Sequence, residues 1–215
     1  MSTWLLATRS QGKRAELTPM LAARGITVMT LDELGVEMHS DEDGIEVFAT
    51  FEDNALAKAR YFSARTGMPC LADDSGLCID ALDGAPGVRS RRFAADHGHV
   101  STTGQDEETA NNEAVVDACW DSGRAPPWSA RYACAAAYCD GLREYVTTGF
   151  TEGAVQPEAD GNEGFGYDPF FVSEDLGIAF GRASRDAKAG ISHRGRAVSA
   201  LLAIVLSKQG RYDTR

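Results

Sequence analysis

A buried strand and two carboxylates meet in the stretch Leu71-Ala72-Asp73-Asp74-Ser75-Gly76-Leu77. The apolar residues at its start predict a strand, and aspartate is depleted from strand interiors. Gly76 permits a tight turn that other residues resist. We therefore predict that the strand ends at Asp73-Asp74 and that the turn holds the two carboxylates. Such a pair suits divalent-metal binding or general-base catalysis, whereas the simpler alternative is a solvated acidic turn.

Strands and helices alternate around this stretch and predict an α/β fold. Apolar runs and helical spacing recur before it, and a long hairpin turns at Asp140-Gly141 after it. We expect a mixed, elongated central sheet with flanking helices, formed as two lobes with a substrate cleft between them. The strands are predicted at 4–7, 26–30, 69–73, 128–138, 143–152 and 170–172, and the helices at 11–23, 51–64, 102–123 and from 193 onward.

Two of the predicted helices begin with cations, which the helix macrodipole disfavours. Lys13 follows the predicted N-cap Ser10, and His193 and Arg194 follow the predicted N-cap Ser192. An anion bound nearby would explain such cations, because the N–H groups at a helix start also attract anions. A Walker A motif is absent, so the alternative for Lys13 is an exposed basic turn.

The composition is that of a globular protein with a strong negative charge. The chain has 215 residues, 43% hydrophobic and 25% charged, which allows one large domain with a sizeable core. Its net charge of −11 argues against nucleic-acid binding but is compatible with a small anionic substrate surrounded by local cations and a metal. The sequence has neither an apolar stretch long enough to span a bilayer nor signal-peptide features at its N-terminus. We expect a cytoplasmic protein without a membrane partner, whose five cysteines are reduced.

Two aromatic residues, a glycine and a carboxylate come together in Phe165-Gly166-Tyr167-Asp168-Pro169. Aromatic rings stack on nucleobases, and Asp168 can accept a hydrogen bond from a ring N–H. These residues therefore suit the binding of a nucleobase. The alternative is a set of core aromatics followed by an Asx-Pro turn.

Taken together, these stretches resemble the inosine triphosphate pyrophosphatase family, the noncanonical purine nucleoside triphosphate (dITP/XTP) pyrophosphatases. The resemblance covers nearly the whole chain, and the order and spacing of its blocks argue against coincidence. The blocks are Ala7-Thr8 with Gly12-Lys13, Phe51 through Arg60, Ala72 through Leu77, Gly84 through Gly87, Phe165 through Pro169, and Ser192 through Gly195.

The resemblance implies one nucleoside triphosphate pyrophosphatase domain over residues 1–215. Such enzymes hydrolyse ITP, dITP and XTP to the monophosphate and pyrophosphate with Mg²⁺, and a homodimer is implied as well. Asp74 matches the catalytic carboxylate, which is also a metal ligand. Substrate-binding positions are matched by Thr8, Arg9, Ser10, Gln11, Gly12, Lys13, Ser75, Phe165, Gly166, Tyr167, Asp168, Lys188, His193 and Arg194.

Three of these positions receive more detailed roles. We expect Lys13, helped by Lys188, to neutralise charge that develops on the pyrophosphate leaving group. Arg194 offers donors that fit the 6-keto oxygen of hypoxanthine or xanthine and not the 6-amino group of adenine. A polar site of this kind rejects the wrong partner strongly.

The sequence departs from the family pattern at two places. Arg9-Ser10 stands where the family has Gly-Asn, which adds a cation beside the phosphates, and Asp53 replaces the usual Glu. The second metal ligand has three candidates, Asp41, Glu42 and Glu46, and we assign it to Glu42. A nucleotide-binding regulator without catalysis and a kinase-like enzyme are the competing function classes. The intact Asp73-Asp74-Ser75 argues against the first, and the missing kinase motifs argue against the second.

Overall fold

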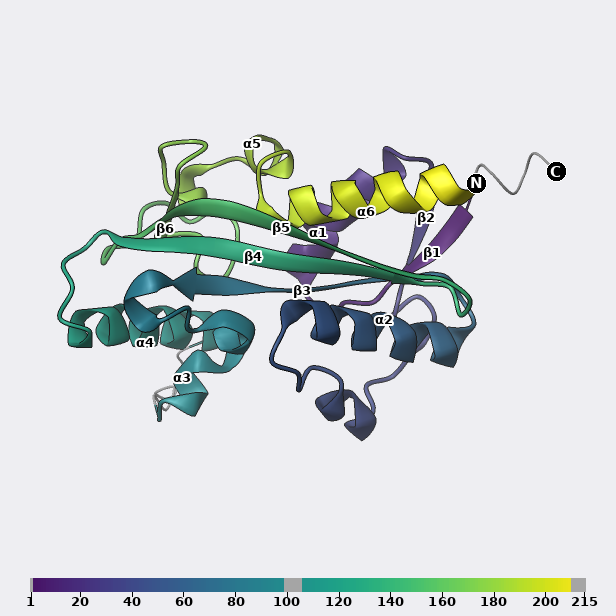
Figure 1. The fold of residues 1–215 in the computed structure, drawn as a ribbon, viewed down its shortest axis with the longest axis horizontal. Helices are drawn as coiled ribbons and strands as arrows, with labels where there is room; N and C mark the ends of the chain where they lie inside the picture. The colour runs from purple at the N-terminus through teal and green to yellow at the C-terminus, as the bar shows by residue number, and fades with distance from the viewer. Residues whose placement is uncertain (1, 99–105, 210–215) are drawn as a thin grey trace. The chain divides into compact units, whose positions relative to one another are not determined.

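A mixed six-stranded sheet with the strand order β2-β1-β3-β4-β5-β6 forms the centre of the protein (Figure 1). The structure, a computed structural model, describes residues 2–98 and 106–209. Strand β1 pairs in parallel with β2 and β3, whereas β5 and β6 are antiparallel, so the predicted α/β class with a mixed sheet is confirmed. The strands are β1 Ser2–Leu6, β2 Ile26–Thr30, β3 Cys70–Ile79, β4 Trp128–Cys139, β5 Glu144–Val155 and β6 Phe171–Ser173, and the helices are α1 Gln11–Ala22, α2 Phe51–Thr66, α3 Phe93–Asp96, α4 Glu107–Asp121, α5 Arg185–Ala189 and α6 His193–Gln209.

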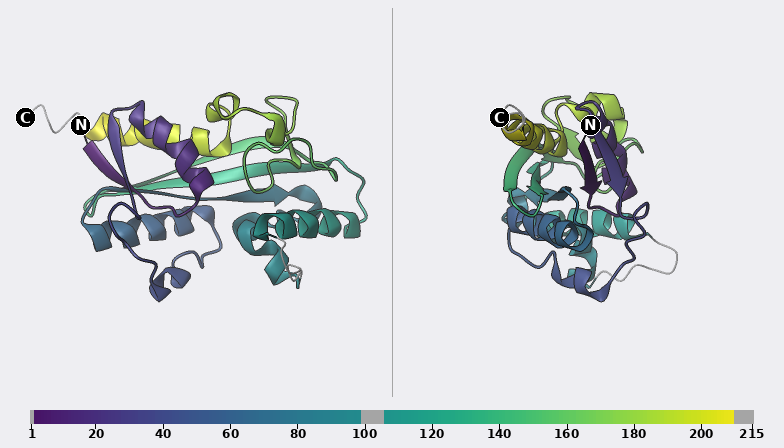
Figure 2. Two further views of the ribbon diagram at one scale, coloured as in Figure 1. Left: turned by 180° about the vertical axis from the view of Figure 1, so that it is seen from behind. Right: turned by 90° about the vertical axis from the view of Figure 1, so that its right-hand side faces the viewer.

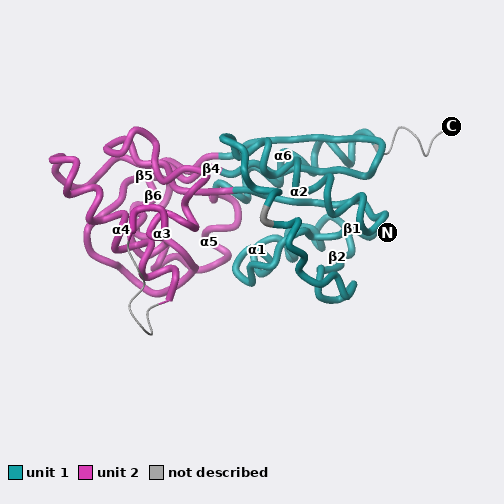
Figure 3. Tube along the Cα trace, turned by 90° about the horizontal axis from the view of Figure 1, so that it is seen from below, with its two compact units in different colours: residues 1–74, 134–149, 193–215 teal, residues 75–133, 150–192 magenta. Residues whose placement is uncertain are grey.

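The chain divides into two compact units, coloured separately in Figure 3. Unit 1 comprises Met1–Asp74, Cys134–Gly149 and His193–Arg215, and unit 2 comprises Ser75–Ala133 and Phe150–Ser192. Strands β3, β4 and β5 each run from one unit into the other. A single functional domain over 1–215 and a cleft between two lobes stay predictions.

Unit 1 is a three-layer sandwich because alternate strand residues point to opposite faces of the sheet. Leu6 packs with Leu17 of α1 and Leu201 of α6 on one face. Leu5, its neighbour along β1, packs with Ala59 of α2 on the other face. Figures 1 and 2 show α1 and α6 on one side of these strands and α2 on the opposite side.

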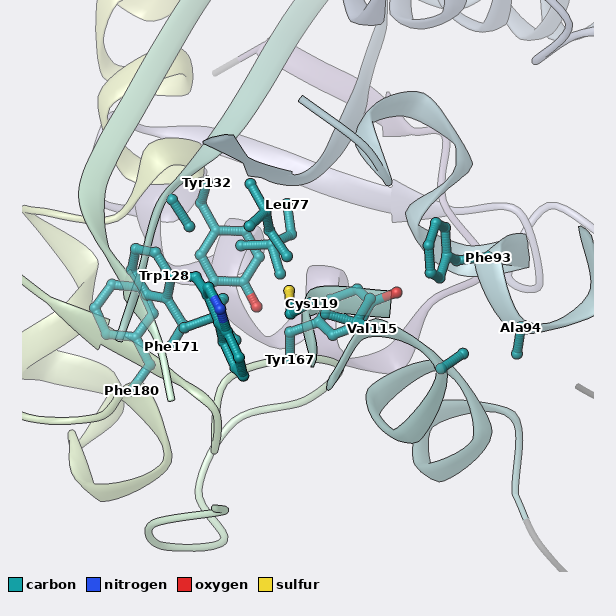
Figure 4. Packing of buried hydrophobic residues seen from close by; sticks show 14 of the residues in the cluster. Leu77, Phe93, Ala94, Val115, Cys119, Trp128, Tyr132, Tyr167, Phe171 and Phe180 are labelled. Atoms are coloured by element: carbon teal, nitrogen blue, oxygen red, sulfur yellow. The ribbon is translucent and has the colours of Figure 1, made fainter. Parts of the chain in front are cut away.

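Unit 2 has an aromatic core, seen closely in Figure 4. Tyr132 lies 4.7 Å from Phe171 and 6.1 Å from Phe180 between ring centroids. Leu77 of β3 and Val115 of α4 belong to the same buried cluster. Aromatic pairs at such distances contribute stability beyond the area that they bury.

The prediction that the strand ends at Asp73-Asp74 is wrong, because β3 continues without a break to Ile79. Asp73 is tolerated inside the strand because Lys13 and Arg194 pair with it, and the Asp74 side chain accepts a hydrogen bond from Asn54. Gly76 is needed for a close approach and not for a turn. A Cβ there would overlap the Gly87 carbonyl oxygen and the Ser90 hydroxyl oxygen. Ser90 Oγ also accepts a 2.9 Å hydrogen bond from the Leu77 N–H, which holds the two segments together.

Replacing Gly76 with alanine is therefore expected to lower the free energy of unfolding by ~1–3 kcal/mol through overpacking. The added methyl group meets backbone at Gly87, which yields less easily than a flexible side chain. Gly190→Ala is the matched control in unit 2, since nothing lies within 4 Å of a Cβ there and its φ is −88°. Urea denaturation of both variants measures the difference, and equal stabilities would contradict the close approach at Gly76.

Most other predicted elements agree with the structure to within a few residues. Strand β2 coincides with the prediction at 26–30, and Ser10 caps α1 by accepting from the Lys13 N–H. Helix α2 extends to Thr66 and ends at Gly67, which has a φ of 69°. Helix α4 begins at Glu107 after its N-cap Asp106, and positions 102–105 of the predicted helix lie outside the described residues.

In the part of the chain that the structure describes, no helix has the length and apolarity to cross a membrane.

Candidate active site

Asp73 is fully buried in unit 1 and is held by cations from both ends of the chain. Its Oδ2 lies 3.0 Å from Lys13 Nζ in α1 and accepts a 3.0 Å hydrogen bond from Arg194 Nε in α6. Burial alone would raise the pKa of Asp73, but Lys13, Arg194 and Lys58 outweigh it, and the pKa lies well below its ordinary value. Asp73 therefore stays ionised and anchors the two cations.

Asp74, the next residue of β3, has the opposite electrostatic character. Its side chain is buried, and its Oδ2 accepts a 2.9 Å hydrogen bond from Asn54 Nδ2 of α2. Burial raises the pKa of Asp74 above its ordinary value, and the nearby charges of Lys13 and Lys58 counteract this only in part. The pKa values of these neighbouring carboxylates are shifted in opposite directions, an arrangement in which Asp74 suits the role of a base.

Glu46 and Lys58 complete the charged surroundings of Asp74. The Lys58 ammonium forms an ion pair with Glu46, and its side chain is largely buried. Burial would lower the pKa of Lys58, but the charges of Glu46, Asp73 and Asp74 raise it overall. The negative charge of Glu46 also contributes to raising the pKa of Asp74.

Glu42, our predicted second metal ligand, forms hydrogen bonds with Arg9 and His39. Its Oε1 accepts from Arg9 at 2.8 Å and from the His39 N–H at 3.2 Å, and its Oε2 accepts from Arg9 Nε at 3.2 Å. Arg9 also donates to the Val36 carbonyl oxygen at 3.2 Å. The Arg9 side chain, which is one of the departures from the family pattern, thus ties the loop before α1 to the segment around Glu42.

The remaining loop positions before and in α1 present polar groups close together. Thr8 is buried, and its Oγ1 accepts a 3.2 Å hydrogen bond from the Ser10 N–H. Gln11 and Gly12 form the first turn of α1, followed by Lys13. This loop therefore brings a hydroxyl, a helix start and the Lys13 ammonium together, a combination that suits phosphate binding.

Arg194, which we predicted to contact the base, is 3% exposed and belongs to a buried network of ion pairs. Besides Asp73 it contacts Glu16 of α1, so one guanidinium joins two carboxylates. His193 opens α6 and is buried as well. The structure therefore assigns Arg194 a structural contact that the sequence reasoning missed.

In unit 2, the predicted purine-binding loop is held at both ends. Asp168 Oδ2 accepts from the Phe165 N–H at 2.9 Å and from Lys188 Nζ at 2.6 Å. The buried Tyr167 hydroxyl donates to the Ser90 carbonyl oxygen at 2.6 Å. Lys188 also lies 4.8 Å from the centroid of the Phe180 ring, which favours a cation. Ser75, on β3, belongs to unit 2 too.

The predicted site residues thus form two groups. Those at positions 8–13, 42, 74, 193 and 194 lie in unit 1, and those at 75, 165–168 and 188 lie in unit 2. Sequence reasoning did not assign roles to Asn54, Lys58 or Glu16. A signal existed for the first two, because Asn54 and Lys58 are four residues apart and share one face of α2.

Comparisons with known proteins identify the family of this chain. The Ham1 family model matches residues 4–204. A dITP/XTP pyrophosphatase of Nitratidesulfovibrio vulgaris is 40% identical over 203 residues, which cover 94% of this chain and 94% of that protein. One from Streptomyces avermitilis is 38% identical over 208 residues, covering 95% and 98%. A solved HAM1 protein from Coxiella burnetii is 30% identical and superimposes with a TM-score of 0.79 over 96% of this chain and 100% of that one. The chain belongs to the Ham1 family.

Proposed function

We propose that this chain hydrolyses the noncanonical purine nucleoside triphosphates ITP, dITP and XTP to the monophosphate and pyrophosphate. The observation that carries the proposal is the pair Asp73 and Asp74, adjacent buried carboxylates of which the first pairs with Lys13 and Arg194 and the second accepts a hydrogen bond from Asn54. Relatives named dITP/XTP pyrophosphatases share 40% and 38% of their aligned residues with this chain.

The chemistry follows from the residues of unit 1. Asp74 accepts a proton from a water molecule as the water oxygen bonds to the α-phosphorus. The bond from that phosphorus to the bridging oxygen breaks, and pyrophosphate leaves with the bridging oxygen. Lys13, fixed by Asp73, places a positive charge where the leaving group gains negative charge.

The donors near Asp74 fit a magnesium ion. Mg²⁺ is bound through one or two carboxylates with water and phosphate oxygens, and Asp74 and Glu46 supply such carboxylates. Among the side chains that the structure describes, no three of His, Cys, Asp or Glu form a metal-binding group, so the other ligands would be phosphate and water oxygens. When bound, Mg²⁺ neutralises phosphate charge. Arg9 bonds to both carboxylate oxygens of Glu42, whereas Lys58 pairs with Oε1 of Glu46, so we propose Glu46 in place of Glu42 as the second ligand.

Metal binding distinguishes the two glutamates. Glu46→Gln is expected to weaken Mn²⁺ binding, measured by electron paramagnetic resonance without nucleotide, by at least about tenfold, because the loss of an outer-shell partner alone costs about 10–100-fold. Glu42→Gln is the matched control and is expected to change the affinity by less than about threefold. A larger loss in Glu42→Gln than in Glu46→Gln would restore Glu42 as the ligand.

Product analysis tests the function itself. The protein is incubated with Mg²⁺ and ITP, with ATP and GTP in parallel. We expect IMP and pyrophosphate from ITP and little product from ATP. Inorganic phosphate or phosphoryl transfer would instead indicate a kinase-like enzyme, and binding of ITP without turnover would indicate a regulator.

Two expectations accompany the proposed activity. The family resemblance implies a homodimer, which light scattering coupled to gel filtration measures directly. The composition and the resemblance together imply a cytoplasmic enzyme, which acts on free nucleotides and not on nucleic acid.

A further inference from the structure

Helix α4 contacts the predicted purine-binding loop at Gly166, through two side chains one turn apart. Glu108 Oε2 accepts a 2.9 Å hydrogen bond from the Gly166 N–H. Asn112 Nδ2 donates a 3.1 Å hydrogen bond to the Gly166 carbonyl oxygen. Both residues lie on one face of α4, since they are four positions apart.

These two hydrogen bonds fix the peptide groups on both sides of Gly166. The N–H belongs to the peptide that joins Phe165 to Gly166, and the carbonyl belongs to the peptide that joins Gly166 to Tyr167. Gly166 has a φ of 63°. Because glycine adopts negative φ angles about as easily, its own preference does not fix this conformation. Rotation of either peptide plane would break a contact with α4, so Glu108 and Asn112 restrict the backbone between the two aromatic residues.

Stability alone does not account for Asn112. Its side chain is buried, and its Oδ1 has no hydrogen-bond partner among residues 2–98 and 106–209. A buried acceptor without a partner destabilises a fold, and an apolar side chain of similar size avoids that cost. The useful contribution of Asn112 is therefore its contact with Gly166.

We propose that Glu108 and Asn112 are positioning residues for purine recognition, an inference that rests on the proposed function. They hold the Phe165–Asp168 loop in the backbone conformation that places the half-buried Phe165 ring against the base, while Tyr167 is buried in the core. The far end of the loop is held independently, by Lys188 at Asp168 and by Ser90 at Tyr167. The Phe165 N–H donates to Asp168 Oδ2 within the loop, so the contacts with α4 hold the two peptide groups at Gly166.

The experiment compares kcat and KM for ITP and for GTP, together with the Tm, in the full-length protein. Asn112→Leu and Glu108→Ala are each expected to lower the ratio of kcat/KM for ITP over GTP about tenfold, mainly through KM for ITP. Asn112→Leu is expected to keep or raise the Tm, because the unpartnered acceptor is removed. Glu108→Gln retains an acceptor oxygen and is expected to restore most of the ratio. Asp117→Asn, an exposed charge change on the same helix, is the control and leaves the ratio unchanged.

Each result bears on the inference. An unchanged ratio in both Asn112→Leu and Glu108→Ala overturns it, whatever happens to the Tm, because the contacts would then be structural only. Failure of the wild-type protein to hydrolyse ITP is a different result, since it refutes the proposed function and the inference with it. Wild-type turnover with an altered ratio in both variants supports both.

Discussion

Asp74→Asn is expected to lower kcat for ITP hydrolysis about 10³-fold, because the variant keeps the shape of the side chain but cannot accept a proton from water. We do not expect the substitution to lower the stability of the fold. Burial disfavours the charge of Asp74 and raises its pKa, so a neutral amide removes an unfavourable buried charge. The Asn54 side chain can still bond to the carbonyl oxygen of an asparagine. We therefore expect an equal or higher Tm.

Single-turnover hydrolysis and thermal unfolding measure the two parts of this prediction separately. Asp121→Asn, an exposed aspartate at the end of α4, serves as the matched control and should keep wild-type kcat. Activity of Asp74→Asn within about tenfold of wild type would exclude Asp74 as the base. A large fall in Tm would instead show that its charge is needed for folding.

Arg194→Met is expected to lower the free energy of unfolding by ~3–5 kcal/mol, because it leaves two carboxylates near each other without the cation that joins them. Arg194 is buried and contacts both Asp73 and Glu16. Methionine retains the length of the side chain but not its charge. Arg89→Met is the matched control, since Arg89 pairs with Asp96 at 2.6 Å while remaining 47% exposed. An exposed pair contributes less than ~1 kcal/mol, which screening by solvent reduces further.

The effect of Arg194→Met should depend on pH. The folded-state pKa of Asp73 is lowered, so its ionised form stabilises the fold above the ordinary aspartate pKa of about 3.9. That contribution is lost as the pH falls below this value toward the folded-state pKa. The variant lacks one of the cations that lower the pKa, so its stability should fall less steeply in acid. Guanidinium unfolding between neutral and acidic pH measures this, and a pH-independent difference between the proteins would contradict the role assigned to Asp73.

Local sequence signals were sufficient for most of the secondary structure. The N-cap Ser10, the apolar run at 26–30 and the stop at Gly67 each act through bonds and conformations within a few residues. The motif blocks also pointed to the family, and the family comparison confirms it. These features depend on neighbours along the chain, which a sequence displays directly.

The charged centre depended on the tertiary structure. Asp73 and Asp74 broke the strand pattern, yet β3 continues through them. Asp73 pairs with Lys13 and Arg194 from helices distant in sequence, the latter 121 residues away, and Asp74 bonds to Asn54 of α2. Glu42 likewise forms an ion pair with a residue distant in sequence, Arg9, which lies 33 residues earlier. A buried carboxylate is stable only where a countercharge lies within a few ångströms. That distance is set by how the helices pack on the sheet, so the sequence determined which charges exist and the tertiary structure decided which of them pair.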